Sequence, residues 1–496
     1  MVPAIGPRYG ARSMAPSRSR RARIRRTIPL LAVALLVAAG VLVFGPLVPS
    51  PVSGPIGAAT SASPGPSESP RSPRPSPVAS PPRSPSPPAS VRPTAPPSAS
   101  PGPSAAPTPA ALLPVPVLTT ATRRALQARL DQLRERYGIP GISAAIDFPD
   151  GSRWIGVSGL ADVAAKVPVE PGTGFAIASI SKTFTAALVL ALVDDGLVDL
   201  DASARRYLPD VAKVPSAVTV RQLLDHTSGL QDYFFHRDID RLLLGDRDVR
   251  WEAARTLRFI GKPYFAPGRG WHYSNTNYFV LGLLAEAVGG APVGDQVRAR
   301  FLEPLALDRT WYQPDEPAGP SVAHGYRFRA AETDAPPIDL GDGSDLVPFT
   351  SVVTAAGAAG GFASTAGDLA RWARALYGRD DVLSEATRIA MIDQIATSRF
   401  KPRVPYGLGV QVVEIDGRRT FGHSGRLLGS RGVMRYLPDH DVAGVILTNQ
   451  SRTDPAVILR ALLKIAFFDP TTRPASPAPS PAASPTPVPI PSPSAL

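Results

Sequence analysis

Ser179 and Lys182 stand three residues apart in the segment FAIASISKTFTAA, residues 175–187. The apolar run after Lys182 predicts a buried helix that begins near Ser179, and side chains three positions apart share one face of a helix. A serine hydroxyl is a weak nucleophile, but a neighbouring lysine that is kept neutral can take its proton. The pair therefore indicates a nucleophilic serine with a lysine base. The alternative is an ordinary solvent-facing helix start, because Ser-x-x-Lys also occurs by chance.

A second candidate group is Tyr273-Ser274-Asn275, which follows Pro267-Gly268 and leads into a predicted helix at 279–288. A tyrosine can relay a proton when a nearby cation lowers its pKa, and an asparagine can donate to a substrate carbonyl. These side chains could complete the chemistry of Ser179. The alternative is a turn in which Asn275 caps the following helix.

The third candidate group is His423-Ser424-Gly425, which we place between two predicted strands. A glycine there would let a substrate backbone approach a strand closely, and the histidine could orient a substrate carboxylate or polarise the site. The alternative is a plain turn.

The elements that must position these groups follow from hydrophobic periodicity. Helices are predicted at 119–137 and 456–468, and helical patterns dominate 179–290. Strands are predicted at 142–148, 153–159, 406–415, 419–422, 432–437 and 442–448. Strands at both ends with helices between them predict a two-lobed α+β protein with one antiparallel sheet.

The 58 prolines divide the chain, because most of them lie in two stretches rich in Pro, Ser and Ala. Such stretches cannot bury enough apolar surface to offset the entropy of ordering. We therefore predict a disordered linker at 49–116, a folded domain at 117–470 and a disordered tail at 471–496.

We predict that residues 1–27 form a basic cytoplasmic segment, because residues 1–28 contain eight arginines and no acidic residue. The uncharged segment 28–48 is long enough to cross a bilayer as a helix, and the positive-inside rule sends the rest of the chain outward. We expect a single-pass signal anchor in the cell membrane with an extracytoplasmic catalytic domain; a cleavable signal peptide is the alternative. Since the net charge of +12 lies mainly in these flanks, no nucleic-acid partner is expected.

Several kinds of chemistry have no support in the sequence. The chain has no cysteine, which excludes disulfides, thiolate metal sites and a cysteine nucleophile. No Gly-x-Ser-x-Gly or His-Glu-x-x-His motif occurs. We therefore expect neither a metal nor a cofactor.

Together, in this order and spacing, the three motifs resemble those of the serine β-lactamase and penicillin-binding superfamily, specifically the branch of class C β-lactamases, D-Ala-D-Ala carboxypeptidases and esterases. Four further segments share the resemblance, at 192–210, 219–233, 263–290 and 358–372. The resemblance implies a β-lactamase/transpeptidase-like α+β fold, with an antiparallel sheet flanked by helices and an all-helical lobe. One transmembrane helix and the disordered linker would precede it.

The resemblance also implies roles for individual residues. Ser179 would be the nucleophile, Lys182 its activator and Tyr273 the proton shuttle to the leaving group. Four residues would form the substrate-binding part of the site: Asn275, His423, Gly425 and Arg426. Asn275 would contact the substrate or Lys182. The backbone N–H groups of Ser179 and Arg426 would form an oxyanion hole. His226, in the segment HTSG, is expected to be structural.

The expected function is that of a serine hydrolase acting through a covalent acyl-serine intermediate. Its substrate would be an ester or a D-Ala-D-Ala-like peptide outside the cytoplasm, such as a cell-wall peptide. True class C β-lactamases have lysine where this chain has His423, so carboxypeptidase or esterase activity is expected rather than efficient β-lactam hydrolysis. The alternative is a catalytically silent penicillin-binding-like protein that recognises cell-wall peptide or a protein partner.

Overall fold

The computed structural model describes residues 116–468, apart from 212, 317, 320, 329–335, 397–399 and 401–403. The predicted basic segment, signal anchor and tail lie outside the described residues, as does all but the last residue of the predicted linker. Within the described part, no helix combines the length and the apolar character that a membrane span requires.

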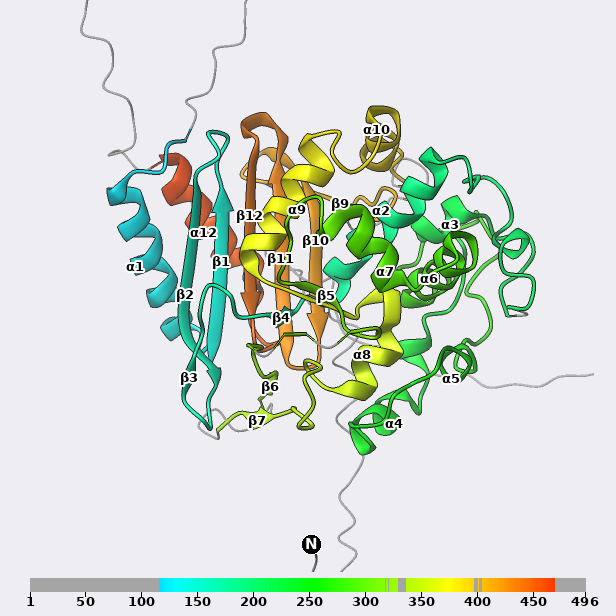
Figure 1. Cartoon of the computed structure of the whole chain (residues 1–496), viewed down its shortest axis with the longest axis horizontal. Helices are drawn as coiled ribbons and strands as arrows, with labels where there is room; N and C mark the ends of the chain where they lie inside the picture. Colours follow the sequence, from blue (N-terminus) through cyan, green and yellow to red (C-terminus); the bar gives the residue numbers. More distant parts are fainter. Residues whose placement is uncertain are drawn as a thin grey trace, which may run out of the picture. The chain divides into compact units, whose positions relative to one another are not determined.

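One antiparallel sheet of seven strands, in the order β3-β2-β1-β12-β11-β10-β9, forms the centre of the described part (Figure 1). Its strands are β1 (Gly141–Asp147), β2 (Arg153–Asp162), β3 (Val167–Pro168), β9 (Gln411–Ile415), β10 (Arg418–Leu427), β11 (Ser430–Leu437) and β12 (Val442–Thr448). Strand β1 pairs with β12, so that Ile142 lies opposite Thr448. The first and last strands of the domain are therefore neighbours, and β10 lies near one edge.

Two terminal helices, α1 (Thr120–Arg136) and α12 (Pro455–Phe468), cover one face of the sheet (Figure 1). Helix α1 is amphipathic and buries Leu126, Leu130 and Leu133, which recur at helical spacing. The Thr119 hydroxyl accepts a hydrogen bond from Thr122 N at 3.1 Å and caps the helix. This layer shields the sheet on the side away from the catalytic candidates.

The remaining helices pack on the other face and beyond β10 (Figure 1). They include α2 (Ser181–Asp194), α3 (Val220–Leu224), α4 (Ile239–Gly245), α5 (Ala253–Leu257), α6 (Asn275–Gly289), α7 (Val293–Val297), α8 (Thr350–Ala356), α9 (Ala366–Gly378) and α10 (Glu385–Asp393). Short strands among them are β4 (Phe175–Ala176), β5 (Thr310–Tyr312), β6 (Tyr326–Arg327), β7 (Ile338–Asp339) and β8 (Phe362–Ser364).

Helix α2 is an interior helix, because residues 181–192 are all buried. Its sequence is apolar on nearly every side, as expected for a helix surrounded by protein. The Phe184 ring stacks on Trp372 of α9, with ring centroids 4.2 Å apart. Such packing holds the first turns of α2, and with them Lys182, in one position.

The predicted α+β architecture with an antiparallel sheet is confirmed. The two terminal helices and strands β1, β2, β11 and β12 lie close to their predicted ranges. Two local predictions differ from the structure. Only Gln411–Ile415 of the predicted strand 406–415 is a strand. The strand predicted at 419–422 continues to Leu427, so His423, Ser424 and Gly425 lie inside β10 rather than between strands.

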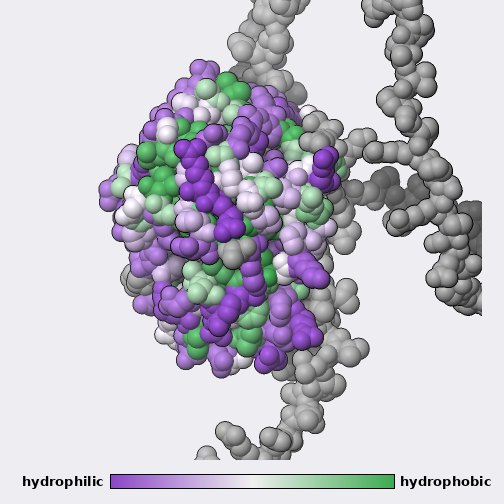
Figure 2. All heavy atoms as spheres, turned by 90° about the vertical axis from the view of Figure 1, so that its right-hand side faces the viewer, coloured by the Kyte–Doolittle hydropathy of each residue, from purple (hydrophilic) through white to green (hydrophobic). Residues whose placement is uncertain are grey.

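The surface on the helical side mixes polar and apolar residues (Figure 2). The exposed large hydrophobic residues of the described part come from separate segments: Val117, Val167, Leu197, Phe235, Val249, Tyr264, Ile338 and Ile389. Single exposed hydrophobic residues are normal on a protein surface, so they indicate no docking site.

Candidate active site

Ser179 lies in a 3₁₀ turn, Ala178–Ile180, directly before α2. Ala178 has a φ of +51°, a left-handed conformation that is strained for a residue with a Cβ atom. Strand β10 presses against this turn, because a Cβ atom on Gly425 would lie 2.1 Å from Ile177 O. The turn is thus fixed between α2 and β10, with Ser179 only partly buried at the junction.

Lys182 is completely buried at the start of α2. Its Nζ lies 3.2 Å from Ser179 Oγ, 2.8 Å from Asn275 Oδ1 and 2.6 Å from Ala359 O. Burial lowers the pKa of Lys182 to about 7, although the nearby Asp232 carboxylate acts in the opposite direction. A substantial fraction of this lysine is therefore neutral at neutral pH.

The three contacts of Lys182 Nζ suit a general base. A neutral amine has two N–H groups and one lone pair. The two shorter contacts, with Asn275 Oδ1 and Ala359 O, are acceptors for the two N–H groups. The lone pair is then directed at Ser179 Oγ, from which it can take the hydroxyl proton.

Asn275 begins α6 and links Lys182 to a buried carboxylate. Its Nδ2 donates to Asp232 Oδ2 at 2.8 Å, while Asp232 Oδ1 accepts from Phe234 N at 3.0 Å. Burial raises the pKa of Asp232, against the opposing effect of these hydrogen bonds and of Lys182. We did not identify Asp232 from the sequence, although it lies in the segment 219–233 that shares the family resemblance.

The Tyr273 hydroxyl is buried and makes no hydrogen bond of ordinary geometry with any residue that the structure describes. Burial raises the pKa of Tyr273, and the nearby Ser179 hydroxyl partly offsets this increase. Its ring lies over Lys182, with Nζ 5.0 Å from the ring centroid. Tyr273 therefore stays protonated at neutral pH, beside both members of the Ser–Lys pair.

His226 joins the segment HTSG to the loop that carries Tyr273. Its Nδ1 lies 3.2 Å from Ser274 N and 3.0 Å from Asn277 Nδ2, two groups that can both donate to it. Its backbone carbonyl accepts from His272 N at 3.1 Å. Burial holds the pKa of His226 well below its usual value. These contacts agree with a structural part for this neutral histidine.

His423 is buried, and both of its ring nitrogens have partners within the protein. Nδ1–H donates to Ser424 O at 2.7 Å, and Nε2 accepts from the Tyr406 hydroxyl at 2.9 Å. Burial and the proximity of Lys182 hold the pKa of His423 well below its usual value. The ring is therefore neutral, and in this arrangement it has no free N–H group to orient a substrate carboxylate. The partner Tyr406 was not identified from the sequence.

Gly425 and Arg426 follow on β10. The close approach expected at Gly425 is made by Ile177 of the protein itself, where we had expected a substrate backbone. Arg426 pairs with Arg431 across the hairpin, and burial together with the Arg431 charge lowers the pKa of Arg426. The packing at Gly425 brings the backbone of residue 426 next to the turn of Ser179.

Asp162, His324 and Asp339 form a group that could ligate a cation, with ligand atoms within 4.8 Å of one another. His324 Nδ1 lies 2.8 Å from Asp339 Oδ2, so the cluster forms its own hydrogen bond. Asp162 and Asp339 end β2 and β7, and His324 lies two residues before β6. Among the described residues, none of the three is a hydrogen-bond partner of Ser179 or Lys182.

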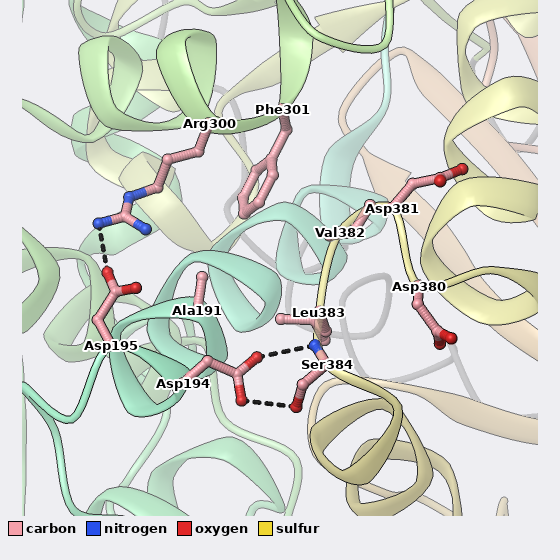
Figure 3. A pocket seen from close by; sticks show the side chains of 10 residues that line it. All are labelled: Ala191, Asp194, Asp195, Arg300, Phe301, Asp380, Asp381, Val382, Leu383 and Ser384. Carbon is pink, nitrogen blue, oxygen red and sulfur yellow. Dashed lines mark hydrogen bonds and ion pairs between the residues drawn. The ribbon is translucent and has the colours of Figure 1, made fainter.

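A pocket of about 300 Å³ lies at the other end of α2 from Lys182 (Figure 3). Asp194 accepts hydrogen bonds there from Ser384 N and Oγ, at 2.9 and 2.8 Å, and Asp195 pairs with Arg300 at 2.7 Å. These hydrogen bonds and the ion pair give Asp194 and Asp195 partners within the protein, and the bonds to Ser384 connect the end of α2 to the start of α10. The pocket therefore has a structural explanation and contributes no group to the candidate active site.

Comparison with known proteins agrees with this geometry. A family model described as Beta-lactamase matches residues 126–466. Penicillin-binding protein 4* of Bacillus subtilis (strain 168) is 28% identical over 368 residues, which cover 72% of this chain and 78% of that protein.

Two solved structures share both fold and sequence. The D-stereospecific amidohydrolase from Streptomyces sp. is 28% identical, with a TM-score of 0.58, covering 70% of this chain and 98% of that one. The D-amino acid amidase from Ochrobactrum anthropi SV3, complexed with L-phenylalanine amide, is 28% identical, with a TM-score of 0.59, covering 70% and 97%. The chain therefore belongs to the beta-lactamase family, and it is a serine hydrolase of the kind that includes penicillin-binding proteins and D-amino acid amidases.

Proposed function

We propose that the enzyme transfers the acyl group of an ester, amide or peptide to Ser179 and then to water. The observation that carries this proposal is the position of Lys182 Nζ. It is buried, 3.2 Å from Ser179 Oγ, and its two shorter contacts are acceptors for its N–H groups. A buried, neutral lysine that is held in this way can accept the serine proton.

In the acylation step, Ser179 Oγ attacks the carbonyl carbon of the substrate while its proton moves to Lys182 Nζ. The carbonyl oxygen becomes an oxyanion, which would accept hydrogen bonds from the backbone N–H groups of Ser179 and Arg426. As the tetrahedral intermediate collapses, the bond to the leaving amine or alcohol breaks. The leaving group takes the Tyr273 proton, and Tyr273 recovers a proton from Lys182. An acyl-Ser179 ester remains.

In the deacylation step, water attacks the ester carbonyl and gives up a proton to the neutral Lys182, with Tyr273 as relay. The second tetrahedral intermediate releases Ser179 Oγ, which takes the proton back, and the product is a free acid. Each side chain thus returns to its starting protonation state. The Tyr273 hydroxyl suits this relay because it lies beside Ser179, its ring lies over Lys182, and no other hydrogen bond among the described residues holds it.

The substrate class is inferred from the third motif and from the relatives. Because the ring of His423 is neutral and both its nitrogens are engaged, it supplies no positive charge for the carboxylate of a D-Ala-D-Ala peptide. Two of the similar structures are named for activity on D-configured amides. We therefore propose esters and D-amino-acid amides or peptides as acyl donors, ahead of D-Ala-D-Ala carboxypeptidation.

The test is turnover by the full-length chain and by its Ser179→Ala variant. The substrates would be p-nitrophenyl acetate, the p-nitroanilides of D- and L-phenylalanine, and a peptide ending in D-Ala-D-Ala. We expect turnover of the ester and of the D-anilide, both lost in the variant, with the D-anilide preferred over its L-isomer. Equal rates in the two proteins would contradict the proposed chemistry. Preference for the D-Ala-D-Ala peptide would contradict only the proposed substrate class.

The location of the reaction is a further part of the proposal. It is supported by the uncharged segment 28–48 and by the arginines that precede it. An anchored domain outside the cytoplasm would meet envelope substrates first. Cell fractionation followed by external protease treatment tests this: recovery in the membrane fraction and external cleavage are expected, whereas protection from the protease would contradict it.

A further inference from the structure

Among the residues that the structure describes, Asp232 is the one buried carboxylate in direct contact with the groups around Lys182, and the reaction steps above do not use it. The residue is 2% exposed, and it caps the short 3₁₀ helix Tyr233–Phe235. One carboxylate oxygen accepts from Phe234 N at 3.0 Å and the other from Asn275 Nδ2 at 2.8 Å. A carboxylate with both oxygens fixed in this way has one orientation.

That orientation determines which way round the amide of Asn275 lies. An ionised carboxylate only accepts hydrogen bonds, so the NH₂ end of the amide must face Asp232 and its oxygen must face away. The oxygen then lies 2.8 Å from Lys182 Nζ and accepts one of its N–H groups. Without a carboxylate at this position, the amide could turn over and present a donor to the lysine.

The segment that carries Asp232 is itself clamped to the start of α6. Thr276 Oγ1 donates to Gln231 O at 2.6 Å and accepts from Tyr233 N at 3.1 Å. Asp232 and Asn275 therefore cannot drift apart without breaking these bonds as well. A continuous set of hydrogen bonds runs from the backbone of Phe234 to the nucleophile.

We propose that Asp232 is a positioning residue which, by fixing the amide of Asn275, directs the lone pair of Lys182 at Ser179. This inference rests on the proposed function, because it assigns a task to Asp232 in that same reaction. Asp232 does not touch the reacting atoms; it acts through Asn275. This role requires that both oxygens of the Asp232 side chain accept hydrogen bonds. An amide of the same shape has only one such oxygen, so it should not support the reaction in the same way.

The Asp232→Asn variant reverses that polarity. Its oxygen must still accept from Phe234 N, so its NH₂ group faces Asn275, whose amide must turn over to accept it. The NH₂ group of Asn275 then faces Lys182, where it binds the lone pair that the serine proton needs. We expect kcat/KM to fall by on the order of 100-fold, at the lower end of what a positioned general base contributes.

The double variant Asp232→Asn with Asn275→Asp restores the direction of both hydrogen bonds, from position 232 to position 275 and from Lys182 to position 275. Its negative charge lies at position 275, in direct contact with Lys182, rather than at position 232. The amide introduced at position 232 would donate to the carboxylate introduced at position 275, and that carboxylate would accept from Lys182. We expect this exchange to recover about tenfold of the lost kcat/KM, as contacts in one network are strongly coupled.

The pH profile separates this positioning task from a merely structural one. Titratable groups facing Lys182 on the other elements are Asp232, Tyr273, Tyr278, His226 and His423. Both histidines are neutral, so Asp232 supplies the negative charge nearest Lys182. Its loss should move the acid limb of kcat/KM to lower pH, and the charge-exchanged variant should move that limb to higher pH.

The matched control is Asp225→Asn. Asp225 is half-buried and accepts from Thr227 N at 2.9 Å and Thr227 Oγ1 at 2.6 Å, and it is not a hydrogen-bond partner of Lys182. This variant should change the melting temperature and leave the acid limb in place. The experiment measures kcat/KM for p-nitrophenyl acetate between pH 5 and 9, with melting temperatures, for the full-length chain and all variants.

The outcomes distinguish this inference from the proposed function. An Asp232→Asn variant within about threefold of the wild type, with an unchanged acid limb, would overturn the positioning role. If turnover does not depend on Ser179, the proposed function fails. A crystal structure of the same variant then decides the positioning role: displaced or turned Asn275 and Lys182 side chains support it, and unchanged Lys182 contacts overturn it.

Discussion

Replacing Gly425 with alanine should damage catalysis through the backbone alone. A Cβ atom at this position would lie 2.1 Å from Ile177 O and 3.2 Å from Ala178 Cβ, whereas ordinary contacts begin at about 3.4 Å. Because the closest atom belongs to the backbone, no side chain can rotate away. Strand β10 and the turn of Ser179 must therefore separate by roughly 3.4 − 2.1 = 1.3 Å.

A separation of that size removes the backbone N–H of Arg426 from hydrogen-bonding distance of an oxyanion on the carbonyl attacked by Ser179. Loss of one oxyanion donor lowers kcat by about 10²- to 10³-fold. We expect a kcat loss in this range for Gly425→Ala, measured with p-nitrophenyl acetate. The rate of acylation in single-turnover experiments should fall by the same factor.

The control for this substitution is Gly245→Ala at the end of α4, where a Cβ atom would meet nothing within 4 Å. That variant should keep the kcat of the wild type. A Gly425→Ala enzyme with kcat within about threefold of wild type, and a circular dichroism spectrum like that of the wild type, would refute the argument that β10 supplies an oxyanion donor.

Three further predictions concern the side chains around Ser179, and a fourth concerns the stability of the third motif. Since the base must be neutral and the pKa of Lys182 is lowered to about 7, kcat/KM should rise with pH through about 7 and then level off; a pH–rate profile that is flat across this range would contradict the assignment. Lys182→Arg, which stays charged, should reduce kcat on the order of 10³-fold in the same assay. Tyr273→Phe should lower kcat by about 10²-fold without lowering the melting temperature, because the lost hydroxyl is buried without a hydrogen-bond partner among the described residues. Tyr406→Phe leaves Nε2 of His423 without its donor, so denaturant unfolding should show a loss of about 1–3 kcal/mol; an unchanged midpoint would speak against that bond.

Local patterns in the sequence were sufficient to predict much of the fold and part of the candidate site. Helix 119–137 and the final helix were predicted from periodicity, and they match α1 and α12 within a few residues. Ser179 and Lys182 were found because three positions of helix bring two side chains together without help from the rest of the chain.

The remaining groups depend on contacts between distant segments. Asp232 meets Asn275 across 43 residues, and Tyr406 meets His423 across 17. Ala359 contributes a backbone carbonyl, which no side-chain pattern can indicate. A single sequence contains no direct signal for such pairs.

The third motif shows that the role of a glycine is hard to predict from the sequence alone. Gly425 suggested a turn or a place for substrate, but its small size serves the approach of Ile177. The actual turn of the hairpin follows four residues later at Gly429, whose φ of +76° is left-handed. Strand continuity through His423 is a property of the sheet register, in which His423 lies opposite Met434.

The central claim is that Ser179 carries the acyl group, and mass spectrometry tests it most directly. The full-length chain would be mixed with a fluorescent penicillin and the reaction quenched in acid. The mass of the intact protein would then be measured, followed by the masses of its proteolytic peptides. We predict one added acyl group per chain, on the peptide that contains Ser179, and none in the Ser179→Ala variant. An adduct on another residue, or an equal adduct in the variant, would contradict the account.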